Sequence, residues 1–218
     1  MPIIVGISGS SGSGKTSLCY QIKDSLVFKS CAIISLDNFY KGITDGTDPK
    51  DYNFDHPNAF DIDQCVQTMK ELKTGKPVQI PIYDFVTHKR KTETKSVNYA
   101  DVILFEGIFA LYWPELRALM DIKIFISTDM DHCLIRRMQR DTQERGRTFQ
   151  QVIEQYLKFV KPAYKEFIRD TREYANIILP NNQDFSIGMQ CIVQRLQCKE
   201  TLNAFSEGSV PVPPLIHK

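Results

Sequence analysis

The stretch Gly9-Ser10-Ser11-Gly12-Ser13-Gly14-Lys15-Thr16 decides the fold of this 218-residue chain. It matches the phosphate-binding pattern G-x-x-x-x-G-K-[ST] at every specified position. The match is informative because an apolar segment, residues 3–7, precedes it and a helical pattern begins near Lys15. Glycines let the backbone wrap closely around phosphate oxygens, and the N–H groups at the helix start then face the anion. The stretch therefore predicts a strand, a phosphate-binding loop and a helix in succession.

Two side chains of this loop can act on a bound nucleotide. Lys15 can reach the β- and γ-phosphates, and the Thr16 hydroxyl can ligate magnesium. A glycine- and serine-rich turn with a chance lysine is the alternative, and the flanking strand and helix argue against it. Ras-type GTPases usually carry Asp-x-x-Gly and Asn-Lys-x-Asp, but no Asp here has Gly three positions later and no Asn-Lys pair occurs. The loop therefore favours a small-molecule kinase over a GTPase.

The composition is that of a globular domain, with 42% hydrophobic and 24% charged residues. The formal net charge of +1 argues against a protein that coats nucleic acid or a membrane with positive charge. No apolar run approaches a bilayer span and no signal-peptide pattern is present, so we expect a cytoplasmic protein that binds neither nucleic acid nor membrane. The six cysteines show no Cys-x-x-Cys pair and predict reduced thiols, mostly buried.

Short apolar runs alternate with segments of helical periodicity along the chain. The runs are rich in Ile and Val without strict alternation, which is typical of strands buried on both faces of a parallel sheet. The order predicts a doubly wound α/β domain: a P-loop NTPase with three α/β/α layers and a five-stranded parallel sheet. The runs are residues 3–5, 32–34, 102–105, 122–126 and 177–179.

Two regions depart from this alternation. Residues 78–85 and 95–99 read as extended chain on either side of a polar stretch, residues 87–94, so we expect a β-hairpin insertion at about residues 77–99. Pro81 indicates an edge strand because proline cannot donate to a ladder. Residues 200–218 hold three prolines and no helical period, which predicts a flexible tail that activity does not require. Residues 1–199 are expected to form one kinase domain.

Two acids directly follow apolar runs of the predicted sheet. Asp37 comes after residues 32–36, and Glu106 after residues 102–105. In a doubly wound sheet, ligands bind beyond the carboxyl ends of the strands, where the phosphate loop also lies. One such acid can help to hold magnesium, and another can orient and deprotonate an attacking hydroxyl. A helix N-cap or a solvated loop acid is the alternative for either acid alone.

Five arginines fall within twelve residues. The first three belong to a predicted helix, and Arg145-Gly146-Arg147 reads as a loop. A solvated helix with i, i+4 ion pairs is the alternative. Phosphoryl transfer needs positive charge over the γ-phosphate and shelter from water, and a mobile lid that carries arginines supplies both. We therefore predict an arginine lid at about residues 136–149, which contains Arg136, Arg137, Arg140, Arg145 and Arg147.

Several strings resemble those of the uridine kinase family, also called uridine–cytidine kinases, and the eukaryotic members in particular. The most specific are Asn53-Phe54-Asp55-His56-Pro57 and Tyr83-Asp84-Phe85-Val86-Thr87-His88. The resemblance covers residues 6–179. It implies transfer of the γ-phosphate of ATP or GTP, with Mg²⁺, to the 5′-hydroxyl of uridine or cytidine by a homo-oligomer, commonly a tetramer. The other matching strings are Leu36-Asp37-Asn38-Phe39-Tyr40, Phe105-Glu106-Gly107-Ile108, Arg137 to Arg147, Gln155-Tyr156 and Lys161-Pro162.

The resemblance also implies roles for the residues at matching positions. Asp37 would be the catalytic base near the 5′-hydroxyl, while Lys15, Arg140 and Arg145 act on the phosphates. Magnesium would be surrounded by Thr16, Asp37 and Glu106. The nucleotide would be contacted by Gly9, Ser10, Ser11, Gly12, Ser13, Gly14, Lys15, Thr16, Ser17 and Asp184. The nucleoside would be contacted by Asp55, Tyr83, Phe85, His88, Ile108, Arg137, Arg147 and Gln155.

The residue types support part of this assignment. A carboxylate such as Asp55 suits a ribose diol because it accepts two hydrogen bonds, and an aromatic slot with a histidine suits a pyrimidine edge. Packing within the hairpin is the alternative for Tyr83 and Phe85, and a solvated loop is the alternative for His88. Pro180-Asn181-Asn182 stands where relatives usually carry Pro-Arg-Gly, close to Asp184.

Two other functions stay open at this point. The first is a kinase of another small hydroxyl substrate, such as a different nucleoside, pantothenate or ribulose phosphate. The second is a catalytically silent nucleotide-binding regulator.

Overall fold

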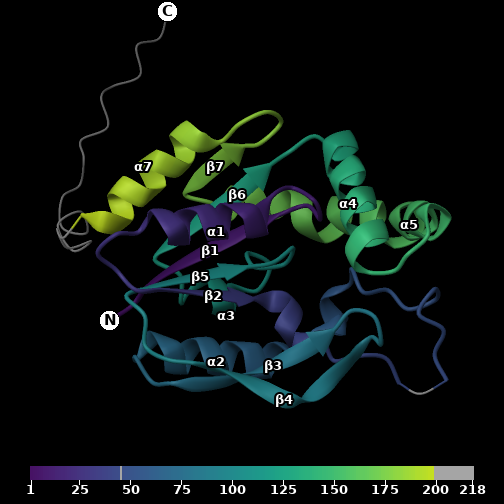
Figure 1. The fold of residues 1–218 in the computed structure, drawn as a ribbon, viewed down its shortest axis with the longest axis horizontal. Coiled ribbons are helices and arrows are strands. Elements are labelled where there is room, and N and C mark those ends of the chain that lie inside the picture. The colour runs from purple at the N-terminus through teal and green to yellow at the C-terminus, as the bar shows by residue number, and fades with distance from the viewer. Residues whose placement is uncertain (45, 199–218) are drawn as a thin grey trace, which may run out of the picture.

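The computed structural model describes residues 1–44 and 46–198, so the predicted tail at residues 200–218 lies outside the described residues. All five predicted apolar runs form strands of one parallel sheet, as expected. These strands are β1 (Ile3–Gly9), β2 (Cys31–Ser35), β5 (Val102–Glu106), β6 (Ile122–Ser127) and β7 (Ile177–Pro180). Their order is β2-β5-β1-β6-β7, which places the strand that leads into the phosphate loop in the middle (Figure 1).

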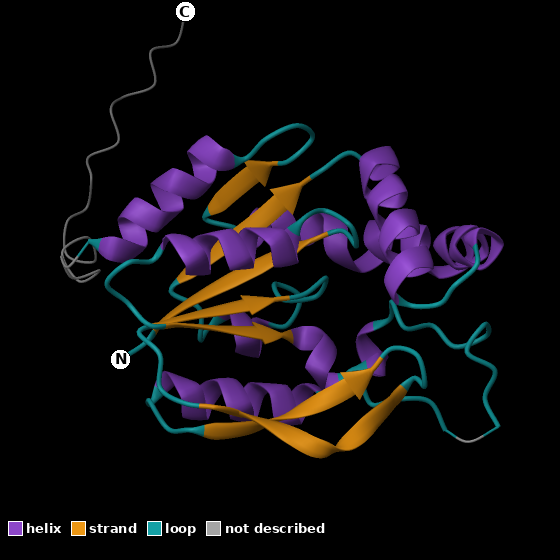
Figure 2. Ribbon diagram, viewed as in Figure 1, coloured by secondary structure: helices purple, strands orange, loops and turns teal. Residues whose placement is uncertain are grey.

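Helices cover both faces of the sheet and complete the predicted three layers (Figure 2). The α-helices are α1 (Lys15–Ser25), α2 (Ile62–Lys73), α3 (Pro114–Arg117), α4 (Met130–Glu144), α5 (Phe149–Gln155), α6 (Lys161–Ala163) and α7 (Ser186–Gln197). Short 3₁₀ turns occupy Leu36–Phe39, Pro57–Ala59 and Arg169–Tyr174, and π-helical turns occupy Tyr156–Val160 and Tyr164–Ile168. Each helix in the described residues is too short or too polar to serve as a membrane span.

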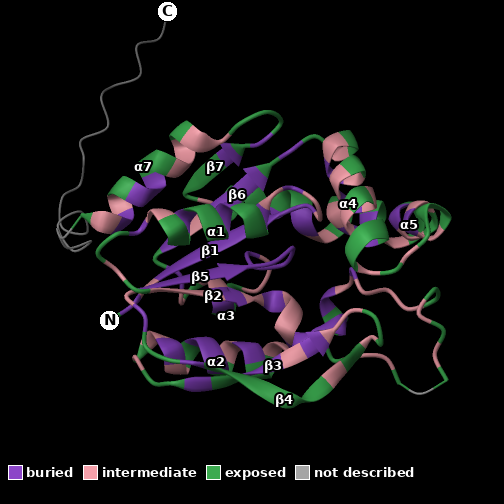
Figure 3. Ribbon diagram, in the orientation of Figure 1, coloured by how far each residue is buried: buried purple, intermediate pink, exposed green. Residues whose placement is uncertain are grey.

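Burial on both faces explains why the apolar runs show no alternation. Along β1, Ile4 packs into the core on the side of α2, whereas Val5 and Ile7 pack into the core under α1 and α7. All three side chains are 0% exposed. Figure 3 shows the same for the neighbouring strands, which are buried along most of their length. Each position on these strands therefore favours an apolar residue.

The six cysteines carry free thiols, as predicted. Only Cys19, Cys65 and Cys133 are buried, while Cys31 is half-buried and the remaining two on α7 and just after it are exposed. The expectation that most of the thiols are buried is therefore wrong for half of them.

A two-stranded antiparallel hairpin lies beside the main sheet, as predicted. It consists of β3 (Val78–Asp84) and β4 (Lys89–Val97), and its register shifts between Pro81 and Tyr83. A proline cannot donate to the ladder, so an irregular edge is where it fits. The predicted extent of the polar connection, residues 87–94, is wrong because β4 already begins at Lys89. Most of β4 is exposed, so a polar sequence forms a strand there (Figure 3).

Arg90 ties this hairpin to the segment that follows β2. Its guanidinium donates to the carbonyl oxygens of Tyr40 at 2.6 Å and Phe39 at 3.0 Å. It also pairs with Asp61, the N-cap of α2, at 3.3 Å. The hairpin is thereby held close to the 3₁₀ turn that carries Asp37.

Candidate active site

The phosphate loop joins β1 to α1 beyond the carboxyl end of the sheet's middle strand. Gly12 and Gly14 have φ angles of 81° and 100°, which glycine adopts without steric cost. A Cβ on Gly12 would lie 2.3 Å from the carbonyl oxygen of Cys133 in α4. A Cβ on Gly14 would lie 2.4 Å from Nδ2 of Asn181. Both glycines are therefore required for backbone conformation and for space.

Lys15 is buried at the base of this loop. Its ammonium group donates to the carbonyl oxygens of Gly9 at 3.2 Å and Ser10 at 2.8 Å. Burial lowers the pKa of Lys15 below its ordinary value, although the negative charges of Glu106 and Asp37 act in the opposite sense. A bound phosphate would offset the cost of this buried charge, so the surroundings of Lys15 fit a phosphate ligand.

The three residues predicted to surround magnesium line one cavity together with Lys15. The Thr16 hydroxyl donates to Oε1 of Glu106 at 3.3 Å, and Asp37 lies on the same cavity wall. Burial raises the pKa of Glu106 above its ordinary value, against the effect of Lys15. Within residues 1–44 and 46–198, no three His, Cys, Asp or Glu side chains form a complete metal site. Two carboxylates and a hydroxyl leave positions for phosphate oxygens and water, which fits magnesium.

Local structure fixes the position of Asp37. The 3₁₀ turn that carries Asp37 begins directly after β2. The backbone N–H of Asp37 donates to Oγ of Ser35 at 3.3 Å. The next residue, Asn38, donates from Nδ2 to the carbonyl oxygen of Pro81 in β3 at 3.0 Å. Asp37 is therefore held between the main sheet and the hairpin.

A second pocket adjoins the phosphate-side cavity, and Asp37 lines both of them. The other residues that line both are Ser11, Tyr83, Phe85, Ile108, Arg140 and Arg145. The second pocket brings together all of the residues that the resemblance assigns to the nucleoside. They are Asp55, Tyr83, Phe85, His88, Ile108, Arg137, Arg147 and Gln155. Phe54, from the Asn53–Pro57 string, lines it as well, and so does Tyr40, to which we assigned no role.

The second pocket contains buried polar groups that a ligand could bond to. Tyr83 is 8% exposed, and within the described part of the chain its hydroxyl has no hydrogen-bond partner. Asp55 is also buried, and burial raises its pKa above the ordinary value although Arg137 acts in the opposite sense. Both groups are costly to bury unless something bonds to them. A ligand with several hydroxyl or amide groups therefore fits here.

His88 lies in the hairpin turn with its ring stacked on Phe54, at a centroid distance of 4.8 Å. Its φ of 55° is the single positive value among the described non-glycine residues. Burial, together with the positive charges of Arg147 and Arg145, lowers the pKa of His88 below 6.5. The imidazole is therefore neutral at neutral pH and can donate or accept a hydrogen bond. A freely solvated loop histidine, the alternative from the sequence, does not match this half-buried and stacked ring.

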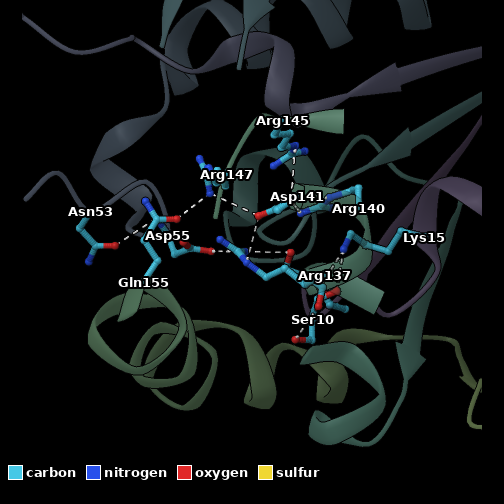
Figure 4. Close-up of polar contacts among 12 residues, drawn as sticks. Ser10, Lys15, Asn53, Asp55, Arg137, Arg140, Asp141, Arg145, Arg147 and Gln155 are labelled. Carbon is cyan, nitrogen blue, oxygen red and sulfur yellow. Dashed lines mark hydrogen bonds and ion pairs between the residues drawn. The ribbon is translucent and has the colours of Figure 1, made fainter. Parts of the chain in front are cut away.

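The arginine segment is a helix followed by a loop, as predicted: α4 ends at Glu144, and a capping box at Thr148 starts α5. Four of the five arginines line the second pocket. Arg136 does not, because its guanidinium donates to the carbonyl oxygen of Asn181 at 3.2 Å. Figure 4 shows that the other four surround Asp141, which the sequence alone did not single out. All four lie within six residues of Asp141 in the sequence, and the contacts with Arg137 and Arg145 have i, i+4 spacing.

Asp184 lies outside the phosphate loop and lines neither of these cavities. It is exposed, and its carboxylate accepts a hydrogen bond from the backbone N–H of Ser186 at 3.0 Å. Nearby Asn181 is buried instead, and its Nδ2 donates to the carbonyl oxygen of Ser13 at 2.7 Å. The departure at residues 180–182 thus places an amide against the phosphate loop. A contact between Asp184 and the nucleotide stays a prediction.

The profile of the Phosphoribulokinase / Uridine kinase family matches residues 4–187. The chain is 46% identical over 198 residues to uridine-cytidine kinase A of Dictyostelium discoideum, covering 91% of this chain and 40% of that protein. It thus spans about two fifths of that relative's length. It is 44% identical over 200 residues to uridine-cytidine kinase B of the same organism, covering 91% of this chain and 82% of that protein. It is 44% identical over 196 residues to a uridine kinase of Staphylococcus carnosus, covering 89% of this chain and 94% of that protein.

Solved structures share the fold at much lower identity. A possible uridine kinase from Bacillus stearothermophilus superposes with a TM-score of 0.59 at 19% identity, covering 81% of this chain and 88% of that one. Phosphoribulokinase from Rhodobacter spheroides superposes with a TM-score of 0.60 at 15% identity, covering 82% and 70%. These similarities agree with the predicted P-loop architecture. Together with the profile match and the relatives above, they lead to one assignment: the chain belongs to the phosphoribulokinase/uridine kinase family.

Proposed function

We propose that this chain transfers the γ-phosphate of ATP to the 5′-hydroxyl of uridine or cytidine and so produces UMP or CMP. The observation that carries this proposal is the position of Asp37 on the boundary of two pockets. One pocket has the lysine, hydroxyl and carboxylate of a phosphate and magnesium site, and the other has buried polar groups among aromatic rings. The printed names of the relatives, uridine kinase and uridine-cytidine kinase, support a pyrimidine nucleoside as the acceptor. GTP is the alternative donor.

On the phosphate side, Asp37 accepts the proton of the attacking hydroxyl as its oxygen bonds to the γ-phosphorus and the bond to ADP breaks. Lys15, Arg140 and Arg145 place positive charge where negative charge develops in the transition state. Thr16, Asp37 and Glu106 would hold magnesium, which when bound would supply positive charge to offset the negative charge of the phosphates.

On the nucleoside side, Asp55 accepts hydrogen bonds from the ribose diol, and Arg137 keeps its carboxylate in place at 3.9 Å. The pyrimidine lies among Tyr83, Phe85 and His88. The unpartnered hydroxyl of Tyr83 and the neutral imidazole of His88 serve the polar edge of the base. We also propose, from the resemblance alone, a homo-oligomer, commonly a tetramer, and from the sequence a cytoplasmic location.

A panel of hydroxyl substrates tests the proposal against its two rivals. ADP release is measured with uridine, cytidine, purine nucleosides, pantothenate and ribulose 5-phosphate, each with ATP and Mg²⁺. We expect release with uridine and cytidine well above every other acceptor. Release with a different acceptor alone would overturn the substrate assignment. Release with none of them would favour a silent nucleotide-binding regulator, although buried Lys15 and Glu106 beside Asp37 argue against silence.

Replacement of His88 tests how the base is held. His88→Ala removes a hydrogen bond to a buried ligand group, which costs about 1–3 kcal/mol, and the nucleoside KM should rise roughly tenfold to hundredfold. The KM for ATP should stay constant, because His88 does not line the phosphate-side cavity. Steady-state kinetics with both nucleosides measures these values.

Two further variants control for the turn at His88. Asparagine tolerates the left-handed conformation and keeps a donor and an acceptor, so His88→Asn should lose less than His88→Ala. Thr92→Ala, at an exposed position of β4, should match the native protein. An unchanged nucleoside KM in His88→Ala would show that His88 does not contribute to nucleoside binding. Equal increases in the KM for ATP and for nucleoside would show that the hairpin has collapsed.

A further inference from the structure

One buried carboxylate has no role in the proposed reaction. Asp141, on α4, is 0% exposed, and its two oxygens face different arginines. Oδ1 accepts from Nε of Arg140 at 2.8 Å, and it lies 2.7 Å from Nη2 of Arg140 and 3.6 Å from Nε of Arg145. Oδ2 lies 3.3 Å from Nη1 of Arg147 and 3.5 Å from Nε of Arg137. Figure 4 shows the carboxylate between these four side chains.

The two oxygens contact arginine pairs that differ in which pockets they line. The arginines on Oδ1, Arg140 and Arg145, line both the phosphate-side cavity and the second pocket. Those on Oδ2, Arg137 and Arg147, line the second pocket without lining the phosphate-side cavity. A single carboxylate therefore contacts both arginine pairs.

The arginines on Oδ2 continue from Asp141 to other walls of the site. Nη1 of Arg147 donates to Oε1 of Gln155 in α5 at 2.6 Å. Nη1 of Arg137 donates to Oγ of Ser11 in the phosphate loop at 3.0 Å. The backbone N–H of Arg147 also donates to the carbonyl oxygen of Asp141 at 3.1 Å, which fixes the turn after α4. Asp141 thus connects the lid, the phosphate loop and α5.

The charge balance of this cluster depends on the same carboxylate. Burial and the neighbouring charge of Arg140 both lower the pKa of Arg145, which shows that the arginines repel one another. Burial alone would raise the pKa of Asp141, but Arg137, Arg140 and Arg145 outweigh burial and hold it below its ordinary value. The carboxylate is therefore ionised at neutral pH. Without it, four guanidinium groups would share a small volume with less negative charge to hold them in place.

We propose that Asp141 is a positioning residue, which holds one arginine pair toward the phosphates and the other toward the nucleoside so that both substrates meet at Asp37. This inference rests on the proposed function. The alternative is an ion pair that only stabilises the end of α4. The two differ in kinetics, because a misplaced arginine pair weakens binding and turnover in protein that is fully folded.

Asp141→Asn separates these alternatives, because asparagine keeps the shape and one acceptor oxygen but removes the charge. Thermal unfolding gives the folded fraction, and kinetics below the transition gives kcat and the nucleoside KM. We expect kcat to fall and the nucleoside KM to rise, each by about tenfold to hundredfold. Asp131→Asn, the same change at an exposed position of α4, should match the native protein. A lower Tm with native kcat and KM in Asp141→Asn would overturn the proposal.

Double-mutant cycles test which arginines Asp141 serves. Combined with Arg147→Lys, Asp141→Asn should raise the nucleoside KM by less than the product of the two single effects. Combined with Arg145→Lys, it should lower kcat by less than that product. Fully multiplicative effects in both cycles would show that the residues act independently and would contradict the proposal.

Asp141→Glu covers the case in which the asparagine variant does not fold. It keeps the charge but moves the carboxylate by one methylene, so we expect folded protein with reduced kcat and raised nucleoside KM. Native kinetics in this variant would show that the carboxylate's position is unimportant and would overturn the proposal. A native protein that phosphorylates no nucleoside would overturn the proposed function itself, so the two failures are distinguishable.

Discussion

Asp37→Asn is expected to lower kcat by about two to four orders of magnitude. Asparagine has the same shape but cannot accept the proton of the attacking hydroxyl. Nucleoside affinity should change much less, because the polar groups that hold the ribose and base, Asp55 and His88 among them, lie elsewhere in the second pocket. Turnover at saturating substrates gives the first quantity, and calorimetric titration with uridine gives the second.

Two controls make this result interpretable. Asp63→Asn applies the same change at an exposed position in the first turn of α2 and should leave kcat unchanged. Titration with Mg²⁺ separates the two roles of Asp37, since the loss of a base persists at saturating metal whereas the loss of a metal ligand does not. Near-native turnover of Asp37→Asn would remove the residue from its proposed role.

Gly12→Ala is expected to lower kcat/KM for ATP by about a hundredfold or more, because small displacements of a binding loop have effects of this size. The new Cβ would lie 2.3 Å from the carbonyl oxygen of Cys133, which is backbone within α4 and has little freedom to move. The phosphate loop must shift instead, and its N–H groups shift with it. Kinetics at varied ATP measures the loss, and calorimetry with a non-hydrolysable ATP analogue shows whether it arises in binding.

Gly46→Ala is the matched control for this variant. Gly46 also has a positive φ, 88°, but within the described residues nothing lies within 4 Å of the Cβ position. Alanine there carries only the cost of the left-handed backbone, about 1–2 kcal/mol. We expect a lower Tm with native ATP kinetics. Native ATP affinity in Gly12→Ala would show that the close approach of the loop to α4 is unimportant for nucleotide binding.

The sequence was sufficient to predict the sheet because its strands are buried on both faces, and such strands leave local apolar runs. Order in the sheet depends on long-range pairing, such as Val5 with Ile122 and with Leu104, which no local pattern encodes. The length of β4 was underestimated for a different reason. Its side chains from Lys89 onward are mostly exposed, so they carry no apolar signal that distinguishes a strand from a loop.

The site shows the same distinction between local and long-range information. The phosphate loop is a contiguous string and could be found directly. The residues that the resemblance assigns to the nucleoside all line one pocket of the structure. Arg90 was missed because its partners Phe39, Tyr40 and Asp61 are distant in sequence. Asp141 was missed although its partners are close in sequence, because an acid among arginines also fits the i, i+4 ion pairs of a solvated helix. Asp184 was assigned from the family pattern, although the chain departs from that pattern at Asn181, where an amide now contacts the phosphate loop.

The most direct test of the account identifies the product of the full chain incubated with ATP, Mg²⁺ and uridine, and in parallel with cytidine. Chromatography separates the nucleotides, and ³¹P NMR with proton coupling locates the phosphate on the ribose. We expect UMP and CMP phosphorylated at the 5′-oxygen, in amounts equal to the ADP formed, and no product with Asp37→Asn on the same timescale. Phosphate on the 2′- or 3′-oxygen, or no nucleotide product from either nucleoside, would contradict the proposed function.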